Sequence, residues 1–398
     1  MTRRHLFDNR PVWAEISLSA IEHNFRAIRR HIGPERKILA VVKADAYGHG
    51  AARLSRTLAR AGADMFGVTC WAEGAELRAA GIRKPILALT GFCPGEERRL
   101  LEHRLTPAIT TLEQLRWLDR AAARGRGRVA IHLKLDTGMN RLGIPGGDIQ
   151  KFLDAFSSCR HLVLTGTFTH FAAAEDFSSE QTAHQQREFA AALDTLRAAG
   201  CDPGIVHMAN SAAIAARPDT WAEMVRPGAL LYGYHQFYNP PARTPEIAAQ
   251  MPLRPALSLR ARVVSVKQVP AGAAVGYNAM FIPRKPARIA VLAAGYAEGL
   301  ARALTNRGRV ILHGRCAPLV GIISMDLSMA DVTSLPDVRP GDVATFLGSA
   351  DSASRTPATA APVSAPCSQF ASDVARELGT VTSDVLCAIG RRVPRFYV

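Results

Sequence analysis

A lysine closes the first apolar run of the chain that has the character of a buried strand. The run ILAVVK ends in Lys43 and is followed directly by ADAYGHG. In a barrel of alternating strands and helices, catalytic groups stand at the carboxyl ends of the strands, so Lys43 is expected at the mouth of an active site. A partly buried lysine there has a lowered pKa and can form a Schiff base with an aldehyde cofactor. The same segment also fits a lysine whose stem packs at a strand end while its ammonium group reaches water.

The elements that must position this lysine follow a βα pattern from about residue 37 to residue 234. Eight apolar runs alternate with amphipathic stretches: ILAVVK, MFGVT, PILALT, PAIT, VAIHLKL, VLTGTF, GIVHMAN and GALLYG. Helices are expected over 51–61, 96–103, 112–124, 179–199 and 210–216. The alternation predicts an α/β fold whose N-terminal domain, residues 12–245, is a (β/α)8 barrel of the TIM type. A doubly wound parallel sheet fits the alternation as well.

The remaining residues, 246–398, predict a C-terminal mainly-β domain. Short β-like segments broken by Gly and Pro follow one another there: ALSLRARVVSVKQV, ARIAVLAAG, GRVILHG, APLVGIIS and GDVATFLG. The strand expected over residues 12–18 precedes the barrel and is free to pair with this domain. Residues 349–368 consist mostly of Ala, Ser, Thr and Pro, which predicts a flexible surface insertion.

Composition narrows the classes of protein. The chain has 398 residues and is 48% hydrophobic, without an apolar run long enough to span a membrane or to serve as a secretory signal. We therefore expect a cytoplasmic protein with no membrane partner. The net charge of +15 is spread along the chain and accompanies no nucleic-acid-binding motif, so we expect no nucleic-acid partner. The seven scattered cysteines lack metal-ligand spacing and are expected to be reduced thiols, with no metal site.

Many short blocks, in order along nearly the whole chain, are similar to one known family. They are AEISLSAIEHNFR, AVVKADAYGHG, LKLDTGMNRLG, THFAAAE, HMANSAA, VRPGALLYGY, VGYNAMF, AGYAEGL, ISMDLS and RRVPRFY. On these blocks the chain resembles the alanine racemases, which are pyridoxal 5'-phosphate (PLP) enzymes. The resemblance implies PLP as cofactor and an obligate homodimer with shared active sites.

The resemblance assigns the cofactor contacts. It makes Lys43 the lysine that carries PLP, in agreement with its place at a strand end. Tyr47, Ser211 and the amides of Gly228 and Ala229 become contacts of the cofactor phosphate. Ser211 suits that role because a helix N-terminus offers free N–H groups to an anion.

Arg226 matches the family's partner of the pyridine nitrogen. A guanidinium stays protonated at any relevant pH, so it leaves that nitrogen unprotonated. A neutral pyridine is a weaker electron sink than a pyridinium. Arg226 therefore disfavours side reactions such as transamination.

Racemisation needs two acid/base groups, one on each face of Cα. Lys43 supplies one, and Tyr277 matches the second, which in relatives reaches the barrel of the opposite subunit. A free tyrosine titrates near ~10 and is a poor base at neutral pH unless neighbours favour its phenolate. His170 resembles the residue that links Tyr277 to Arg226 through hydrogen bonds.

The substrate carboxylate and the entrance involve another set of residues. Arg141 resembles the arginine that supports the phenolic oxygen and the carboxylate. The amide of Met325 matches the direct carboxylate donor, and Asp326 orders the same loop. Tyr296 resembles a tyrosine that lines the entrance. Lys134 matches a lysine that is carbamylated in some relatives.

Three positions depart from the family's pattern. Glu175 and Glu298 stand where aspartate is usual, which predicts altered entrance geometry rather than lost chemistry. Ser383 stands where relatives usually carry a tyrosine that donates to the phosphate and narrows the substrate pocket.

The leading function is thus interconversion of L- and D-alanine, which makes D-alanine for peptidoglycan precursors or degrades it. A serine racemase, or one of broader specificity, is the first alternative. A PLP decarboxylase of the same architecture is disfavoured because Arg226 replaces its acidic partner of the pyridine nitrogen. A PLP-binding protein without turnover would lack the β domain and Tyr277.

Overall fold

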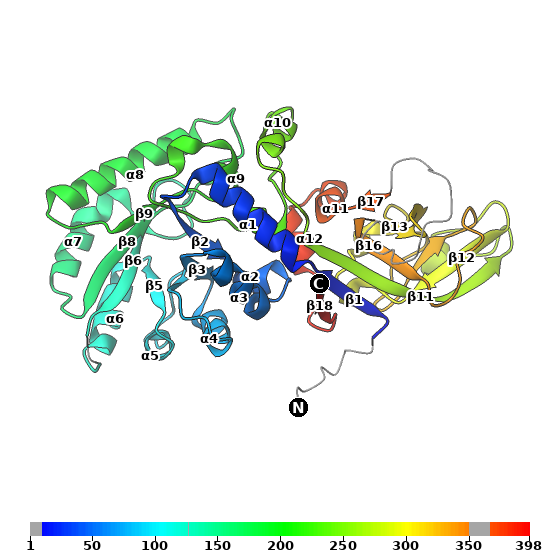
Figure 1. Cartoon of the computed structure of the whole chain (residues 1–398), viewed down its shortest axis with the longest axis horizontal. Helices are drawn as coiled ribbons and strands as arrows, with labels where there is room; N and C mark the ends of the chain where they lie inside the picture. Colours follow the sequence, from blue (N-terminus) through cyan, green and yellow to red (C-terminus); the bar gives the residue numbers. More distant parts are fainter. Residues whose placement is uncertain (1–9, 126, 350–366) are drawn as a thin grey trace. The chain divides into compact units, whose positions relative to one another are not determined.

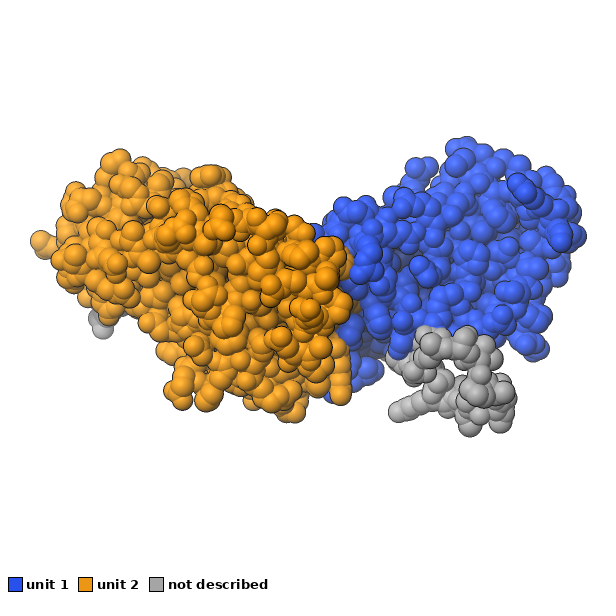
Figure 2. Space-filling model, turned by 90° about the horizontal axis from the view of Figure 1, so that it is seen from above, with its two compact units in different colours: residues 1–19, 47–49, 255–398 blue, residues 20–46, 50–254 orange. Residues whose placement is uncertain are grey.

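The fold is described from a computed structural model that covers residues 10–125, 127–349 and 367–398. The chain forms two compact units, coloured separately in Figure 2. The barrel unit contains residues 20–46 and 50–254. The β unit contains residues 47–49 and 255–398 together with the segment that ends at Ser19. The boundary predicted from the sequence lies between residues 245 and 246.

The barrel unit is built on eight strands in which every neighbouring pair is parallel. In spatial order they are β10 (Met224–Val225), β2 (Lys37–Val41), β3 (Met65–Val68), β4 (Ile86–Ala88), β5 (Thr106–Ile109), β6 (Val129–Asp136), β8 (Leu162–Phe168) and β9 (Ile205–His207). Backbone hydrogen bonds from Glu223 to Val206 and from Arg226 to Ala209 link the two ends of this order. The sheet is therefore a nearly closed (β/α)8 barrel.

Helices lie around the outside of these strands (Figure 1). They are α1 (Leu18–Ile32), α3 (Ala51–Ala61), α4 (Trp71–Ala79), α5 (Glu97–Glu102), α6 (Leu112–Ala122), α7 (Ile149–Ser157), α8 (Gln181–Ala198), α9 (Ser211–Ala216) and α10 (Arg243–Gln250). The spacing of apolar residues in these helices suits packing of one face against the strands. In α3, for example, Leu54 and Leu58 are four residues apart and both buried, as one inward face of a helix requires.

One expected strand is wrong. The run GALLYG is not the eighth strand, because Ala229–Tyr232 forms a 3-10 helix and β10 takes the eighth place. The turn ends at Gly233, whose φ of 97° lies in the left-handed region that favours glycine. The Tyr232 hydroxyl donates to the Val41 carbonyl at 2.8 Å inside the barrel. A fully buried apolar run has no periodicity, so its sequence does not distinguish a strand from a tight helical turn.

The β unit contains a sheet with the strand order β14-β13-β16-β11-β1-β18, and β12 pairs with β11 and β15. Its elements are β1 (Val12–Ile16), β11 (Leu257–Val269), β12 (Ala287–Leu292), β13 (Arg309–Leu312), β14 (Arg315–Pro318), β15 (Ser328–Asp331), β16 (Val343–Ser349), β17 (Ser368–Gln369), α11 (Ala371–Leu378), α12 (Thr382–Cys387) and β18 (Arg395–Tyr397). The strand at the start of the chain, β1, pairs antiparallel with β11 and parallel with β18. The C-terminal region is therefore mainly β, and it includes this N-terminal strand.

Two further expectations concern this unit. Of the insertion expected over 349–368, residues 350–366 lie outside the described residues. The expectation that all cysteines are reduced is wrong for one pair, since Cys316 and Cys367 form a disulfide with a Cα–Cα distance of 5.9 Å. Their separation of 51 residues is not a spacing that identifies a pair from sequence.

Within the described residues, no helix is both long and apolar enough to cross a membrane.

Candidate active site

Lys43 directly follows the strand segment at the carboxyl end of β2. The Val41 amide donates to Pro227 and the Val42 amide to Gly67, so both neighbouring strand ends hold this segment. The next residues turn sharply, because Ala44 and the two residues after it have φ near 52–54°. Lys43 is half-buried at the rim of the barrel.

Glu73 fixes the turn after Lys43. Its two carboxylate oxygens each accept a backbone N–H at 2.7 Å, one from Ala44 and one from Thr69. The left-handed backbone at Ala44 is therefore held from the neighbouring α4. Sequence reasoning missed this role of Glu73.

Arg226 follows β10 and is only 4% exposed. Its guanidinium donates to the His207 Nδ1 and carbonyl (3.1 and 2.8 Å), the Thr169 carbonyl (2.7 Å), the His170 Nδ1 (3.1 Å) and the Met208 carbonyl (3.0 Å). Burial lowers the pKa of Arg226 to about 9, which leaves it a cation at neutral pH. Among the described residues it forms no ion pair with a carboxylate. All its partners are therefore neutral acceptors.

His170 stands two residues beyond β8. Its Nδ1 faces a guanidinium, which can only donate, so this nitrogen is the acceptor and the ring proton lies on Nε2. Burial, and then the charge of Arg226, hold the His170 pKa well below its usual range. Gln185 donates to the His170 carbonyl at 2.9 Å and fixes the backbone. His170 is thus a neutral imidazole with a donor at Nε2.

Lys134 and Arg141 belong to the same basic cluster. Lys134 lies on β6 and is buried, and burial followed by the charge of Arg141 lowers its pKa to about 8. The positive charges of Arg226 and Lys43 also lower the pKa of Lys134. Arg141 lies on the loop after β6, where Asp136 accepts three consecutive backbone amides and shapes the turn. The structure therefore brings the predicted basic residues of the barrel together.

The predicted phosphate contacts Ser211 and Gly228 also meet. The Gly228 amide donates to the Ser211 hydroxyl at 2.9 Å, and Ala229 is the next residue. The cap of α9 is Asn210, whose side chain accepts the Ala213 amide at 3.1 Å. Ser211 is therefore not needed as the helix cap.

Tyr47 belongs to the β unit, in the short segment 47–49. Burial, and then the nearby Cys387, raise the pKa of Tyr47 to about 12, so its hydroxyl stays protonated. The segment is held against the region of α12, because the Arg395 guanidinium donates to the carbonyls of Gly48 and Ile389 at 3.1 and 2.8 Å. Ser383 lies half-buried on the first turn of α12 in the same unit.

Tyr277, Tyr296 and Met325 line one hollow of the β unit, about 370 Å³ in volume. Their exposed fractions are 66%, 44% and 52%. Tyr277 follows Gly276, which has a φ of 75°, and precedes Asn278, which has a φ of 59°, so the tyrosine stands on a tight turn. The structure thus places three predicted site residues side by side on an exposed face.

Arg392 links Asp326 to Glu298. Arg392 donates to Asp326 at 2.6 Å and also pairs with Glu298, which is fully buried. The second Glu298 oxygen accepts the Gly295 amide at 2.9 Å. Glutamate at 298 therefore has a full set of partners at the base of the loop that carries Tyr296.

Glu175 lies half-buried on the loop beyond β8. It acts electrostatically on Tyr238 and Arg217. Burial, and then Glu175, raise the pKa of Tyr238. Glu175 therefore belongs to the surroundings of Tyr238.

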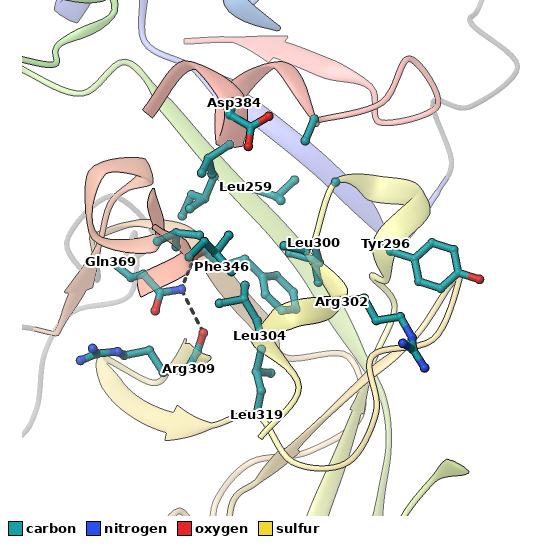
Figure 3. A pocket seen from close by; sticks show the side chains of 17 residues that line it. Leu259, Tyr296, Leu300, Arg302, Leu304, Arg309, Leu319, Phe346, Gln369 and Asp384 are labelled. Carbon is teal, nitrogen blue, oxygen red and sulfur yellow. Dashed lines mark hydrogen bonds between the residues drawn. The ribbon is translucent and has the colours of Figure 1, made fainter. Parts of the chain in front are cut away.

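A second cavity of the β unit, of about 210 Å³, has a mainly aliphatic wall (Figure 3). Leu259, Leu300, Leu304 and Leu319 line it, and Gln369 donates to two backbone carbonyls of its wall at 2.7 and 3.0 Å. Arg302, Arg309 and Asp384 also line this cavity. In the described part of the chain, no group of three His, Cys, Asp or Glu side chains could hold a metal ion.

Comparisons with known proteins cover the same two regions. Residues 16–236 match the family model "Alanine racemase, N-terminal domain", and residues 256–397 match "Alanine racemase, C-terminal domain". Alanine racemase of Geobacter sulfurreducens is 39% identical over 399 residues, which cover 98% of each chain.

Solved structures of alanine racemases are also similar to this chain. Alanine racemase of Clostridium difficile 630 superposes with a TM-score of 0.87 at 31% identity, covering 98% of this chain and 96% of the other. Alanine racemase from Bartonella henselae with covalently bound pyridoxal phosphate gives 0.82 at 28% identity, covering 97% and 99%. With the matched models and relatives extending over both units, the chain belongs to the alanine racemase family.

Proposed function

We propose that this protein interconverts L- and D-alanine with PLP, using Lys43 and a Tyr277 from the partner subunit as the two bases. The observation that carries the proposal is Arg226, a buried cation fixed by neutral acceptors only. A guanidinium in that setting suits the nitrogen of a neutral pyridine, which accepts a hydrogen bond and needs no proton. Lys43 ends the strand next to the one that leads into Arg226.

The residues present fit PLP. Lys43 supplies an amine for the aldehyde carbon, and Arg226 faces the ring nitrogen. The Ser211 hydroxyl, the Ala229 amide and the protonated Tyr47 hydroxyl are donors, as an anionic phosphate requires, and the Gly228 amide, which here donates to Ser211, would have to turn to the phosphate to join them. When bound, PLP withdraws electron density from Cα of the substrate, which makes the proton on that carbon removable.

Arg226 controls the fate of the substrate once the Cα proton has been removed. Its Nε–H, which none of the five contacts above uses, would donate to the ring nitrogen, and because a guanidinium has no acceptor for a ring N–H, that nitrogen would stay neutral. The bound cofactor would then be a weak electron sink, which would favour return of the proton to Cα over its delivery elsewhere. This favours racemisation over transamination.

Two groups handle the proton. Lys43 Nζ takes or returns it at one face of Cα, and the Tyr277 phenolic oxygen does so at the other. His170 presents an N–H at Nε2, which stabilises a phenolate by donating to it. Because Tyr277 is two-thirds exposed in its own chain, we propose that it enters the barrel of the partner. The protein would then work as an obligate homodimer.

Substrate carboxylate binding is proposed for Arg141 and the Met325 amide, with Asp326 ordering the Met325 loop and Tyr296 lining the entrance. Carbamylation of Lys134 is part of this proposal. A lysine with a pKa of about 8 is partly neutral at physiological pH. Its nitrogen bonds to the carbon of CO2 and releases one proton, leaving a carbamate whose negative charge offsets Arg141 and Arg226.

The alternative is a broader specificity that includes serine, and Ser383 favours it. A serine where relatives carry tyrosine leaves room beside the segment that holds Tyr47.

The cytoplasmic location and the role in supplying D-alanine for peptidoglycan precursors stay predictions. The Cys316–Cys367 disulfide adds no support for a reducing compartment.

Purified protein incubated with PLP and L-alanine should form D-alanine. Borohydride reduction followed by peptide mapping should find the pyridoxyl group on Lys43. A pyridoxyl group on Lys134 or another lysine would overturn the assignment of the cofactor lysine. No racemisation of any small amino acid by PLP-loaded protein would overturn the activity.

A further inference from the structure

His132 and His207 form a buried pair inside the barrel, beside Arg226. His132 Nδ1 and His207 Nε2 are 3.0 Å apart, and the rings meet edge-on with centroids 5.1 Å apart. Both side chains are essentially inaccessible to solvent. Neither is used in the proposed proton transfers.

The chain of contacts fixes where the ring protons lie. Arg226 can only donate, so His207 Nδ1 accepts, and the proton of a neutral His207 lies on Nε2. That N–H then donates to His132 Nδ1, which must also be an acceptor. Burial, more than the charge of Arg226, lowers the His132 pKa to about 4 and keeps that of His207 well below its usual range. Both rings are therefore neutral and locked in one tautomer.

The barrel register explains how His132 reaches a residue two strands away. His132 on β6 pairs with Gly166 on β8, while His207 on β9 pairs with Phe168. A β-carbon at position 166 would lie 2.6–2.7 Å from three atoms of the His132 ring. The missing side chain of Gly166 is thus the space that lets His132 cross β8.

Phe168 restrains the other face of the cluster. Its ring stacks on His207 with centroids 4.8 Å apart and planes inclined by 7°, and the Arg226 guanidinium carbon lies 5.4 Å from its centroid. Stacking alone leaves the His207 ring free to rotate in its own plane. The acceptor at His132 removes that freedom.

We infer that His132 is a positioning residue for Arg226: from a space left by Gly166 it accepts the N–H of His207 and so fixes the ring that Arg226 contacts. The inference rests on the proposed function, in which Arg226 faces the cofactor nitrogen. Without an acceptor at position 132, the His207 N–H loses its buried partner. Arg226 still requires Nδ1 as an acceptor, so the N–H stays on Nε2 without a partner and the His207 ring, which helps to hold Arg226, is less firmly placed.

The test compares two replacements of His132, one with and one without an acceptor near the position of Nδ1. His132→Phe keeps a ring but has no acceptor, whereas His132→Asn places a carbonyl oxygen close to the position of Nδ1. We expect His132→Phe to lose roughly ten- to a hundredfold in PLP affinity and in kcat, as for a buried donor left unsatisfied. His132→Asn should stay within about threefold of wild type, and Gly166→Ala, which displaces the ring, should behave like His132→Phe.

The measurements are the Kd of PLP for the apoprotein, the visible absorbance band of the bound cofactor, kcat and KM, with thermal unfolding to follow folding. Loss in His132→Phe and Gly166→Ala with rescue in His132→Asn supports the inference. Equal loss in both His132 variants would mean that the site needs only packing, and would overturn it. So would wild-type behaviour of His132→Phe. Wild-type protein that takes up no PLP would instead overturn the proposed function, and this inference with it.

Discussion

The barrel interior and the tyrosine face of the β unit are organised in opposite ways. Around Arg226, the contacts are buried or partly buried and the direction of each hydrogen bond is determined. Around Tyr277, the predicted site residues lie on an exposed hollow, and the tyrosine itself is 66% exposed. A base must be held within hydrogen-bond reach of the proton that it moves, so an exposed one is incomplete. Under the proposed function, the barrel supplies the preorganised half of a site, and the exposed tyrosine face supplies the half that a partner subunit completes.

Complementation between two inactive proteins is the strongest test of this difference between the two halves. Lys43→Ala and Tyr277→Phe should each lower kcat by at least about 10³-fold. In a hybrid dimer, one site combines an intact Lys43 with an intact Tyr277. Equal mixing with free exchange makes half of the dimers hybrid, so about a quarter of wild-type activity should return. The activity is measured before and after exchange, which mass spectrometry of the dimers verifies. Exchange without recovery would rule out shared sites.

Tyr277→Phe alone should separate the roles of the two bases. The variant keeps Lys43, so it should still exchange the Cα proton of one enantiomer with deuterium from solvent while exchange on the other falls by roughly 10²–10⁴-fold. Tyr296→Phe is the matched control, since Tyr296 lines the same hollow and is given no proton-transfer role. NMR or mass spectrometry of recovered D- and L-alanine measures the bias. Equal loss for both enantiomers would indicate a single base.

The sequence alone predicts part of the buried region around Arg226, because catalytic residues in a barrel lie at the carboxyl ends of the strands. Lys43 and His170 could be placed from the strands before them. The run IHLKL even carries the signal for His132, which is two residues from Lys134 and so on the same face of β6. The sequence of a single strand does not show which residues of distant strands lie beside it. The His132–His207 contact and the role of Gly166 depend on register, which no single strand encodes.

The exposed half and the misassigned strand were less predictable for different reasons. The 3-10 turn at Ala229–Tyr232 is as apolar as a strand, and a tertiary contact of Tyr232 decides its shape. Arg392 contacts Glu298 and Asp326 from distant parts of the chain. No local pattern links an arginine near the C-terminus to either carboxylate.

A smaller effect concerns the stability cost of the basic cluster. The folded-state pKa of Lys134 is lowered from 10.5 to about 8, so the unfolded chain binds more protons between these values. Stability should therefore rise with pH across this window, and the cost of the buried charge is fully present below it. In CO2-free buffer at pH 7, Lys134→Met should raise the unfolding temperature by about 3 °C, with a smaller difference near the upper end of the window.

Calorimetry across this pH range tests the sign of the effect. Lys151→Met is the control, because Lys151 is exposed and pairs only with Asp148 in the described structure. Added bicarbonate should stabilise the wild type and not Lys134→Met if the carbamate forms. A variant that is less stable at every pH would show that the ammonium group of Lys134 stabilises the fold.

The smallest effect that we expect is on substrate choice, and it depends on Ser383. In relatives, a tyrosine at this position is implied to donate to the phosphate and to close the space around the substrate side chain. Here α12 borders the segment of Tyr47: a β-carbon at Gly48 would lie 2.5 Å from the Leu386 carbonyl oxygen, so the two are in close contact. A serine on the first turn of α12 removes most of an aromatic side chain from that region. Since an apolar pocket rejects an added hydroxyl only weakly even when closed, by roughly 100-fold, we expect wild type to racemise serine alongside alanine.

Ser383→Tyr should lower the serine-to-alanine ratio of kcat/KM by about tenfold and tighten PLP binding. Ser383→Phe separates the two roles, because it refills the space without a phosphate donor and should change the ratio but not the PLP Kd. Racemisation of alanine alone by wild type, or an unchanged ratio in both aromatic variants, would mean that another side chain closes the pocket and that Ser383 does not set specificity.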